Sequence, residues 1–228
     1  MAITDEAIGK IKYLIVTGAL RPGDRLPREA DLAERLGLSR NSLREAVRAL
    51  SLINVLDVRQ GDGTYVTSLE PAVLLDALSF VIDFHTDDSV LEFLEVRRIL
   101  EPAATAMAAT RMSADDVAGL RALLAELGDD PSVAELVDSD LEFHRRIAHG
   151  SGNRVLCSLI DGLAGPTRRA RIWRGVTQES AVARTLAEHG AICDAIAAGQ
   201  PDVAGAWATV HVAGVEQWLR AALTEPTW

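Results

Sequence analysis

The spacing of apolar and polar residues divides the chain into two parts with different local patterns. Up to about Thr67 the pattern predicts three helices followed by two short β-strands, at Asn54–Arg59 and Thr64–Thr67. The four residues between these strands, Gln60-Gly61-Asp62-Gly63, are typical of a hairpin turn. The first part is therefore expected to be a small helical unit that ends in a β-hairpin.

From Pro71 onward the apolar residues recur at the i, i+3, i+4 spacing of amphipathic helices, and no segment has a strand pattern. Turn-forming residues predict where the helices break: near Asp87-Asp88, Ser113, Asp129-Asp130-Pro131, Gly150–Asn153, Gly165-Pro166 and Gly199-Gln200-Pro201. We expect an antiparallel bundle of six to seven helices. The predicted organisation is a first domain over residues 1–67, a linker over 68–71 and a helical domain over 72–228.

The composition is that of an ordinary globular protein, with 48% hydrophobic and 25% charged residues. It excludes a largely disordered or collagen-like chain. The net charge of −10 is unevenly spread: residues 1–67 hold 10 basic and 9 acidic side chains, whereas the remainder holds 13 and 24. Because the negative charge belongs to the second part, it does not exclude a nucleic-acid partner for the first.

Neither a membrane span nor a signal peptide is expected. No apolar run approaches ~18 residues, and the first ten residues include the charged Asp5, Glu6 and Lys10. We therefore expect a cytoplasmic protein. Cys157 and Cys193 are the two cysteines, and both fall within helical patterns. Two isolated cysteines in a chain of this size indicate reduced core thiols rather than a disulfide framework.

The segment Leu32–Leu50 has the pattern of a helix-turn-helix. Gly37 gives the backbone freedom for a tight turn, and Ser39 is placed to cap the second helix. The apolar residues of that helix form one stripe: Leu43, Ala46, Val47 and Leu50. A neighbouring face carries a row of arginines: Arg40, Arg44 and Arg48.

A row of guanidinium groups can contact guanine edges and phosphates along the major groove of DNA. The hairpin that follows would form a wing, with Gln60 and Gly61 at its tip. The alternative is a helical hairpin whose arginines are simply solvated. The order of helix-turn-helix, arginine row and wing favours DNA binding.

These residues resemble the winged-helix GntR family of bacterial transcription regulators. The matching segments are Leu26-Pro27-Arg28-Glu29, Leu32-Ala33, Leu36–Arg40, Leu43–Ala46, Leu50 and Gln60–Val66. The resemblance implies that a small set of residues contacts DNA, with the wing tip in the minor groove. This set is Arg28, Ser39, Arg40, Asn41, Arg44, Gln60 and Gly61.

In the helical part, several histidines occupy stripes that are otherwise apolar. Asp140 and His144 stand four residues apart and therefore project from one face of a helix. His189 and His211 lie on the last two predicted helices, at equal distances in sequence from the turn at Gln200. In an antiparallel hairpin these two imidazoles lie at the same height and face each other.

Three imidazoles and one carboxylate that converge in a bundle core favour a divalent transition metal, with zinc the first choice. Nickel, cobalt, manganese or iron could also bind there. The alternative is that each histidine is a hydrogen-bonded core residue. His85 and His149 match no such constellation and are interpreted as surface or helix-end residues.

The helical part is also similar to the FadR-type effector domain, called FCD. The matching segments are Leu94–Pro102, Asp140–His144 and Gly152-Asn153, together with His189 and His211. The resemblance implies that the positions of Asp140, His144, His189 and His211 hold the metal. It also implies a small carboxylate effector that binds to the ion and to a nearby arginine.

Arg97 is the candidate for that arginine, because it falls on an apolar stripe and a buried guanidinium needs an anionic partner. Glu101, one turn later, is the alternative partner. Trp173 is a candidate to line the effector cavity, with a core or interface role as the alternative.

The sequence thus predicts a mainly α protein: a ligand-responsive, homodimeric repressor that binds double-stranded operator DNA and responds to a small carboxylic acid at a metal site. One alternative is a regulator for which the metal itself is the signal. Another is a metal-dependent hydrolase, although no His-Glu-x-x-His or Glu-x-x-His run is present.

Overall fold

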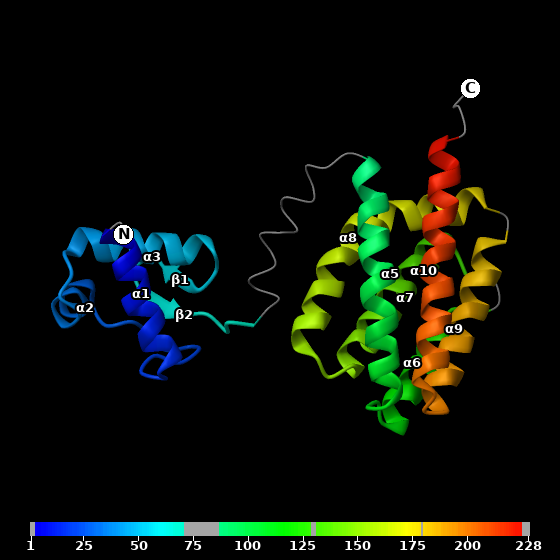
Figure 1. The fold of residues 1–228 in the computed structure, drawn as a ribbon, viewed down its shortest axis with the longest axis horizontal. Helices are drawn as coiled ribbons and strands as arrows, with labels where there is room; N and C mark the ends of the chain where they lie inside the picture. The colour runs from blue at the N-terminus through cyan, green and yellow to red at the C-terminus, as the bar shows by residue number, and fades with distance from the viewer. Residues whose placement is uncertain (1–2, 71–86, 129–130, 179, 225–228) are drawn as a thin grey trace. The chain divides into compact units, whose positions relative to one another are not determined.

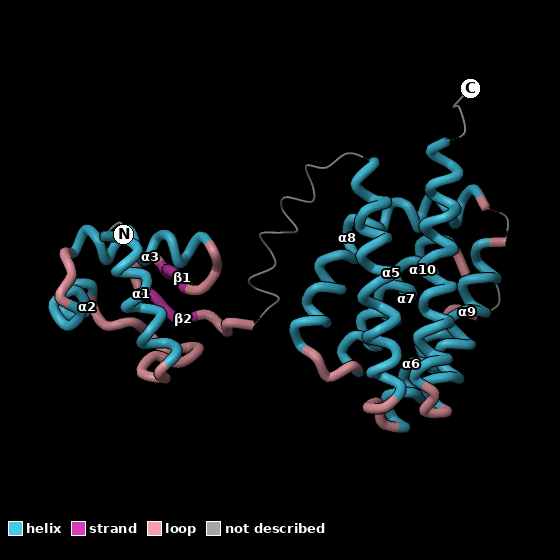
Figure 2. The backbone as a smooth tube through the Cα atoms, viewed as in Figure 1, coloured by secondary structure: helices cyan, strands magenta, loops and turns pink. Residues whose placement is uncertain are grey.

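The computed structural model describes residues 3–70, 87–128, 131–178 and 180–224 (Figure 1). The chain divides into two compact units, residues 1–77 and 78–228. Figure 2 shows that β-strands occur in the described residues of the first unit, whereas the described elements of the second are helices. This confirms the predicted mainly α fold class.

The first unit contains three helices and a two-stranded sheet. Its elements are α1 (Ile3–Val16), α2 (Glu29–Leu36), α3 (Arg40–Leu52), β1 (Leu56–Arg59) and β2 (Gly63–Val66). The strands pair antiparallel, with Leu56 opposite Val66 and Arg59 opposite Gly63. β1 is two residues shorter than the predicted Asn54–Arg59, β2 has the predicted length but starts one residue earlier, and the hairpin lies at the predicted place.

The turn between α2 and α3 forms as the sequence predicts. Gly37 ends α2 with a φ of 63°, a left-handed conformation that glycine adopts without steric cost. The Ser39 hydroxyl caps α3 by accepting a hydrogen bond from the Ser42 amide at 3.0 Å. The predicted apolar stripe of α3 is buried: Leu43, Ala46, Val47 and Leu50. This stripe packs with buried residues of α1, α2 and both strands to make the core of the first unit.

The wing is held by contacts that the sequence pattern does not reveal. Arg25 pairs with Tyr65 through an isolated β-bridge and donates a side-chain hydrogen bond to the Asp62 carbonyl oxygen. A Cβ atom at Gly63 would lie 2.5 Å from Arg25 Nε, so glycine leaves room for this guanidinium. Tyr65 donates a hydrogen bond to Asp62 at 2.9 Å. These contacts fix the turn at the tip of the wing.

The second unit has six helices within its described residues. They are α5 (Asp87–Ala109), α6 (Ala114–Ala125), α7 (Val133–Gly150), α8 (Arg154–Thr177), α9 (Ala181–Ala197) and α10 (Pro201–Thr224). Figure 1 shows α5 and α10 side by side. They approach closely because Gly205 presents no side chain to the Pro102 carbonyl, which lies 3.2 Å from where a Cβ would stand.

One predicted helix break is wrong. The sequence suggests an interruption at Gly165-Pro166, but α8 continues from Arg154 to Thr177. Buried residues lie on both sides of this point, among them Leu163, Thr167 and Ala170, and their packing favours one continuous helix. Tertiary packing here outweighs the weak helix preference of glycine and proline.

Candidate metal centre and DNA-binding surface

Asp140 and His144 come from the middle of α7. A capping box starts this helix: the Ser132 hydroxyl and the Glu135 carboxylate each accept a hydrogen bond from the other residue's backbone amide. Both Asp140 and His144 are buried, with 5% and 6% of their surface exposed. Their four-residue spacing places them on the same inner face, where a polar group requires a partner.

His189 and His211 come from the hairpin formed by α9 and α10. Gly199 has a φ of 63° and makes the tight turn between the two helices. The predicted register therefore follows, and the two imidazole centroids lie 4.7 Å apart. Both side chains are buried. His189 also stacks on Phe143 at 4.2 Å, which restricts the orientation of its ring.

The structure brings these four side chains to one point. Asp140 Oδ1 lies 3.5 Å from His144 Nε2, 3.2 Å from His189 Nε2 and 3.4 Å from His211 Nε2. One ligand atom from each residue lies within 4.8 Å of the others. With ordinary zinc bond lengths, nitrogen and oxygen ligands on a tetrahedral ion are about 3.4 Å apart. The four groups therefore fit one divalent ion.

A second observation supports this fit. The Nε2 atoms of His144 and His189 are buried, and neither has a hydrogen-bond partner among the described residues. Buried polar atoms normally have such partners, because an unsatisfied one costs free energy. An ion at the centre of the cluster would satisfy both nitrogens.

Two of the histidines are held from behind by carboxylates. The Nδ1 atom of His144 lies 3.1 Å from Glu101 Oε2, and that of His211 lies 3.0 Å from Glu188 Oε2. In metal sites such a partner fixes the imidazole tautomer and leaves the other nitrogen free to bind the ion. Neither glutamate was identified from sequence, because the contacts depend on helix rotation. The one signal in the sequence was that Glu101 lies one turn after Arg97 on the same apolar stripe.

The pKa values follow from this packing. Burial acts to raise the pKa of Asp140, but the charge of Arg171 and the contact with His144 outweigh it and hold this pKa well below its usual value. Burial lowers the pKa of His189 to about 4. Burial also opposes the charged form of Glu188, but hydrogen bonds from His211 and Arg184 lower its pKa to about 2. The site therefore combines anionic carboxylates with a neutral His189, the forms that bind metals.

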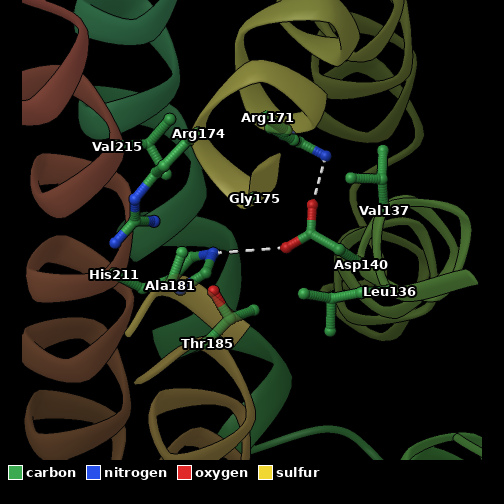
Figure 3. Close-up of a pocket in the computed structure, with 10 residues that line it drawn as sticks. All are labelled: Leu136, Val137, Asp140, Arg171, Arg174, Gly175, Ala181, Thr185, His211 and Val215. Carbon is green, nitrogen blue, oxygen red and sulfur yellow. Dashed lines mark hydrogen bonds and ion pairs between the residues drawn. The ribbon is translucent and has the colours of Figure 1, made fainter. Parts of the chain in front are cut away.

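A small cavity borders the Asp140 side of the cluster. Its free volume is about 30 Å³, and its walls come from four helices. The lining residues are Leu136, Val137, Asp140, Arg171, Arg174, Gly175, Ala181, Thr185, His211 and Val215 (Figure 3). A ligand that enters without moving these side chains must therefore be compact.

Two buried arginines of α8 line this cavity. Figure 3 shows Arg171 directed at one oxygen of Asp140, while His211 faces the other. Arg174 is 3% exposed and donates a hydrogen bond from Nε to Gln178 at 2.8 Å. Its Nη2 atom is buried and has no hydrogen-bond partner among the described residues. Burial lowers the pKa of both arginines, that of Arg171 to about 10.

The two effector candidates predicted from sequence lie elsewhere. Arg97 is buried and pairs with Glu101, the alternative partner considered above, and it also donates a hydrogen bond to Thr167 at 3.1 Å. Trp173 is 43% exposed and packs edge-on against Trp218. Neither residue lines the cavity. The sequence stripe placed Arg97 inside correctly, but it could not show which buried anion Arg97 faces.

The predicted DNA-contacting residues lie on the surface of the first unit. All of them are exposed: Arg28, Ser39, Arg40, Asn41, Arg44, Gln60 and Gly61. Arg44 forms an ion pair with Glu29 at 3.0 Å, which places α2 next to the arginine row of α3. Arg48 pairs with Glu45 on its own helix at 2.8 Å. Exposed ion pairs contribute little free energy, so the paired arginines can exchange these carboxylates for DNA phosphates at a small cost in free energy.

Among the described residues, no helix is both long enough and apolar enough to span a membrane.

Comparison with protein families gives two matches. The model of the bacterial regulatory proteins of the gntR family matches residues 3–66, which include the winged helix-turn-helix. The model of the FCD domain matches residues 92–214, which include the four candidate metal ligands. Together these matches cover most of the chain.

Individual proteins give the same result over nearly the full length. The chain is 32% identical over 212 residues to the HTH-type transcriptional regulator LutR of Bacillus subtilis (strain 168), a match that covers 90% of this chain and 96% of LutR. It is 29% identical over 223 residues to the galactonate operon transcriptional repressor of Escherichia coli (strain K12), with 95% and 96% covered. The solved structure of Streptococcus agalactiae GntR superimposes with a TM-score of 0.75 at 29% identity and covers 94% of this chain and 99% of that one.

Proposed function

The chain belongs to the GntR family of bacterial regulatory proteins and carries an FCD domain, and from this premise we propose that it represses transcription until a small carboxylic acid binds to its metal centre. It is a ligand-responsive transcription regulator, and its relatives are regulators rather than enzymes. We place it in the cytoplasm, on operator DNA, as a homodimer.

The proposal for DNA binding assigns the exposed face of α3 to the major groove and the wing tip to the minor groove. Arg40 and Arg44 carry guanidinium groups that suit guanine edges and phosphates. Ser39 and Asn41 lie at the start of α3, where a helix commonly meets the DNA backbone. Arg28, Gln60 and Gly61 complete the proposed contact set. One winged helix covers few base pairs, which favours a dimer on a pseudo-palindrome.

The proposal for the metal centre rests on the convergence of three buried imidazoles and one carboxylate. Asp140, His144, His189 and His211 would hold the ion, with Glu101 and Glu188 orienting two of the imidazoles. Zinc suits this donor set best, although nickel, cobalt, manganese and iron accept similar ligands. An ion that accepts a fifth or sixth ligand beside these four would supply an attachment point for a carboxylate.

We propose that Arg174 binds the negatively charged carboxylate of the effector. Its buried Nη2 lacks a partner, and a carboxylate in the cavity would supply one in a charge-assisted hydrogen bond. Arg171 lies beside the same cavity but already pairs with Asp140. We therefore propose Arg174, with Arg171 in support, in place of Arg97. Galactonate, which names the operon of one relative, is a hydroxy acid, and compact hydroxy acids are the class we favour.

The small free volume of the cavity supports a second candidate, a regulator for which the metal alone is the signal. One experiment separates the two. Metal-free and metal-loaded protein are screened against small hydroxy acids and sugar acids by thermal shift, and then by operator affinity. A ligand that binds the native state raises its melting temperature. We expect an acid to do so only with metal present, and to weaken operator binding.

Matched arginine variants localise the response. Arg174→Gln should lose the acid-dependent shift, whereas Arg168→Gln should keep it, because Arg168 is an exposed arginine of the same helix that pairs with Asp138. If Arg97→Gln loses the acid-dependent shift and Arg174→Gln keeps it, Arg97 rather than Arg174 contacts the anion. Operator affinity that responds to metal alone, with no acid active, would favour the metal sensor.

A further inference from the structure

A second group of metal-binding side chains lies where α7 meets α8. His149 belongs to the last turn of α7, and Cys157 and Asp161 stand four residues apart on α8. The group begins nine residues beyond Asp140, about two and a half helical turns along α7. It shares no residue with the buried cluster. Sequence spacing predicts a surface or helix-end role for His149, because its partners lie on another helix.

The three side chains are arranged as ligands of one ion. Asp161 Oδ2 lies 3.7 Å from His149 Nε2 and 3.8 Å from Cys157 Sγ, and one ligand atom from each residue lies within 4.8 Å of the others. With ordinary zinc bond lengths, neighbouring ligands on a tetrahedral ion are about 3.4 to 3.6 Å apart. The two separations that involve Asp161 therefore exceed these values by a few tenths of an ångström.

The surroundings of the group also suit a cation. A thiolate and a carboxylate together carry two negative charges, which match a divalent ion. Arg145, whose charge acts on Cys157 and Asp161, is engaged elsewhere: its guanidinium makes two hydrogen bonds to Glu142, at 2.6 and 2.8 Å. The C-terminal end of α7, where His149 lies, carries the partial negative charge of the helix dipole.

We propose that His149, Cys157 and Asp161 form a second divalent metal site, which binds zinc or a similar thiophilic ion through one imidazole, one thiolate and one carboxylate. Sulfur ligands select zinc, cadmium or cobalt over magnesium and calcium. The thiol proton passes to solvent when the sulfur–metal bond forms. His149 and Asp161 are 56% and 38% exposed, so the fourth position faces water.

Such an ion would connect the end of α7 to the first two turns of α8. These helices carry Asp140 and Arg171, which pair with each other in the buried site. The second site would therefore stabilise the helix pair that frames the proposed effector cavity. It would do so whether or not the buried cluster binds metal.

Cobalt absorption tests this proposal on the full-length protein, freed of metal and kept reduced. A thiolate bound to Co²⁺ gives a charge-transfer band in the near ultraviolet, and the buried cluster contains no sulfur ligand. The band therefore reports only the second site. We expect it to saturate at about one Co²⁺ per chain in the wild type. It should also appear in His189→Ala, which removes a ligand of the buried cluster.

Two variants of the second site should respond differently from a cysteine control. His149→Ala, a change at an exposed residue, should weaken Co²⁺ binding by about tenfold or more, and Cys157→Ser should abolish the band. Cys193→Ser should keep it, because Cys193 is buried on α9 outside the group. A wild type without the band at saturating Co²⁺, or a His149→Ala variant that binds as tightly as the wild type, would overturn the proposal.

Discussion

Asp140 serves two sides of the buried site with its two oxygens. Oδ2 accepts from Arg171, and Oδ1 faces the three histidine Nε2 atoms. The arginine keeps the carboxylate ionised despite its burial, so that an anionic ligand is available inside an apolar bundle. A single residue thereby links the four candidate metal ligands to the wall of the cavity.

Removal of a histidine should therefore remove the ion. Purified wild type is expected to carry a divalent ion in the buried cluster, and His189→Ala and His211→Ala should lose most of it, because each deletes one of four ligands. Elemental analysis measures this with all proteins in a Cys157→Ser background, which lacks the second site proposed above, and with Cys193→Ala as the buried control. Wild type and both histidine variants equally empty after zinc addition would favour three ordinary core histidines.

Contacts with operator DNA should be sensitive to the arginines of α3. Arg40→Ala or Arg44→Ala is expected to cost about 1–3 kcal/mol of specific binding and to reduce base preference at one position per half-site. Binding assays at fixed salt on matched and mismatched operators measure both effects. Arg121→Ala, at an exposed ion pair of the helical unit, is the control. Unchanged affinity in both α3 variants would contradict the proposed recognition helix.

The sequence predicted the convergence of the four candidate ligands because each interrupts an apolar stripe. Asp140 and His144 share a helix, and the turn at Gly199 fixes the register of the other two. Glu101 and Glu188 could not be identified in this way, since their contacts depend on how separate helices rotate against each other. The same limit explains the group around His149. One-dimensional spacing specifies the face of a helix but not its neighbour.

At the scale of elements, local signals succeeded at most helix ends and failed inside α8. Ser39, Ser113 and Asn153 cap helices through side-chain hydrogen bonds, as their positions suggest. The Gly165-Pro166 pair, by contrast, was interpreted as an end but lies within a continuous helix. Capping acts locally and can be predicted from a few residues. Continuity through a weak point depends on packing along the whole helix.

The close packing of α5 on α10 should make Gly205 of α10 respond differently from Gly190 of α9 when each is changed to alanine. Gly190→Ala is expected to raise the free energy of unfolding by about 0.5–1 kcal/mol, because alanine favours a helix and nothing lies within 4 Å of the new methyl group. Gly205→Ala should give no such gain, since its methyl would meet the Pro102 carbonyl at 3.2 Å. Chemical denaturation measures both. An equal gain at both positions would contradict the close approach.

For the whole molecule, the division of charge matches the division of roles. The first unit is nearly neutral and presents Arg40, Arg44 and Arg48 on an exposed helix face, whereas the second carries the negative charge and buries Arg171 and Arg174 beside a small cavity. In the proposed function, operator DNA and a small anion would thus bind to different units of one chain. An effector can influence transcription only if its binding free energy depends on the state of the DNA-binding unit.

This dependence leads to a prediction for the complete regulator. If an acid weakens operator binding by some factor, operator DNA must weaken acid binding by the same factor, and typical couplings span about 5- to 150-fold. Calorimetric titration of metal-loaded protein with the acid, with and without saturating operator, measures the second factor. A repressor released by its effector requires weaker acid binding on DNA. Tighter acid binding in the operator complex would contradict that direction and identify an effector that promotes DNA binding, even if the metal and arginine assignments hold.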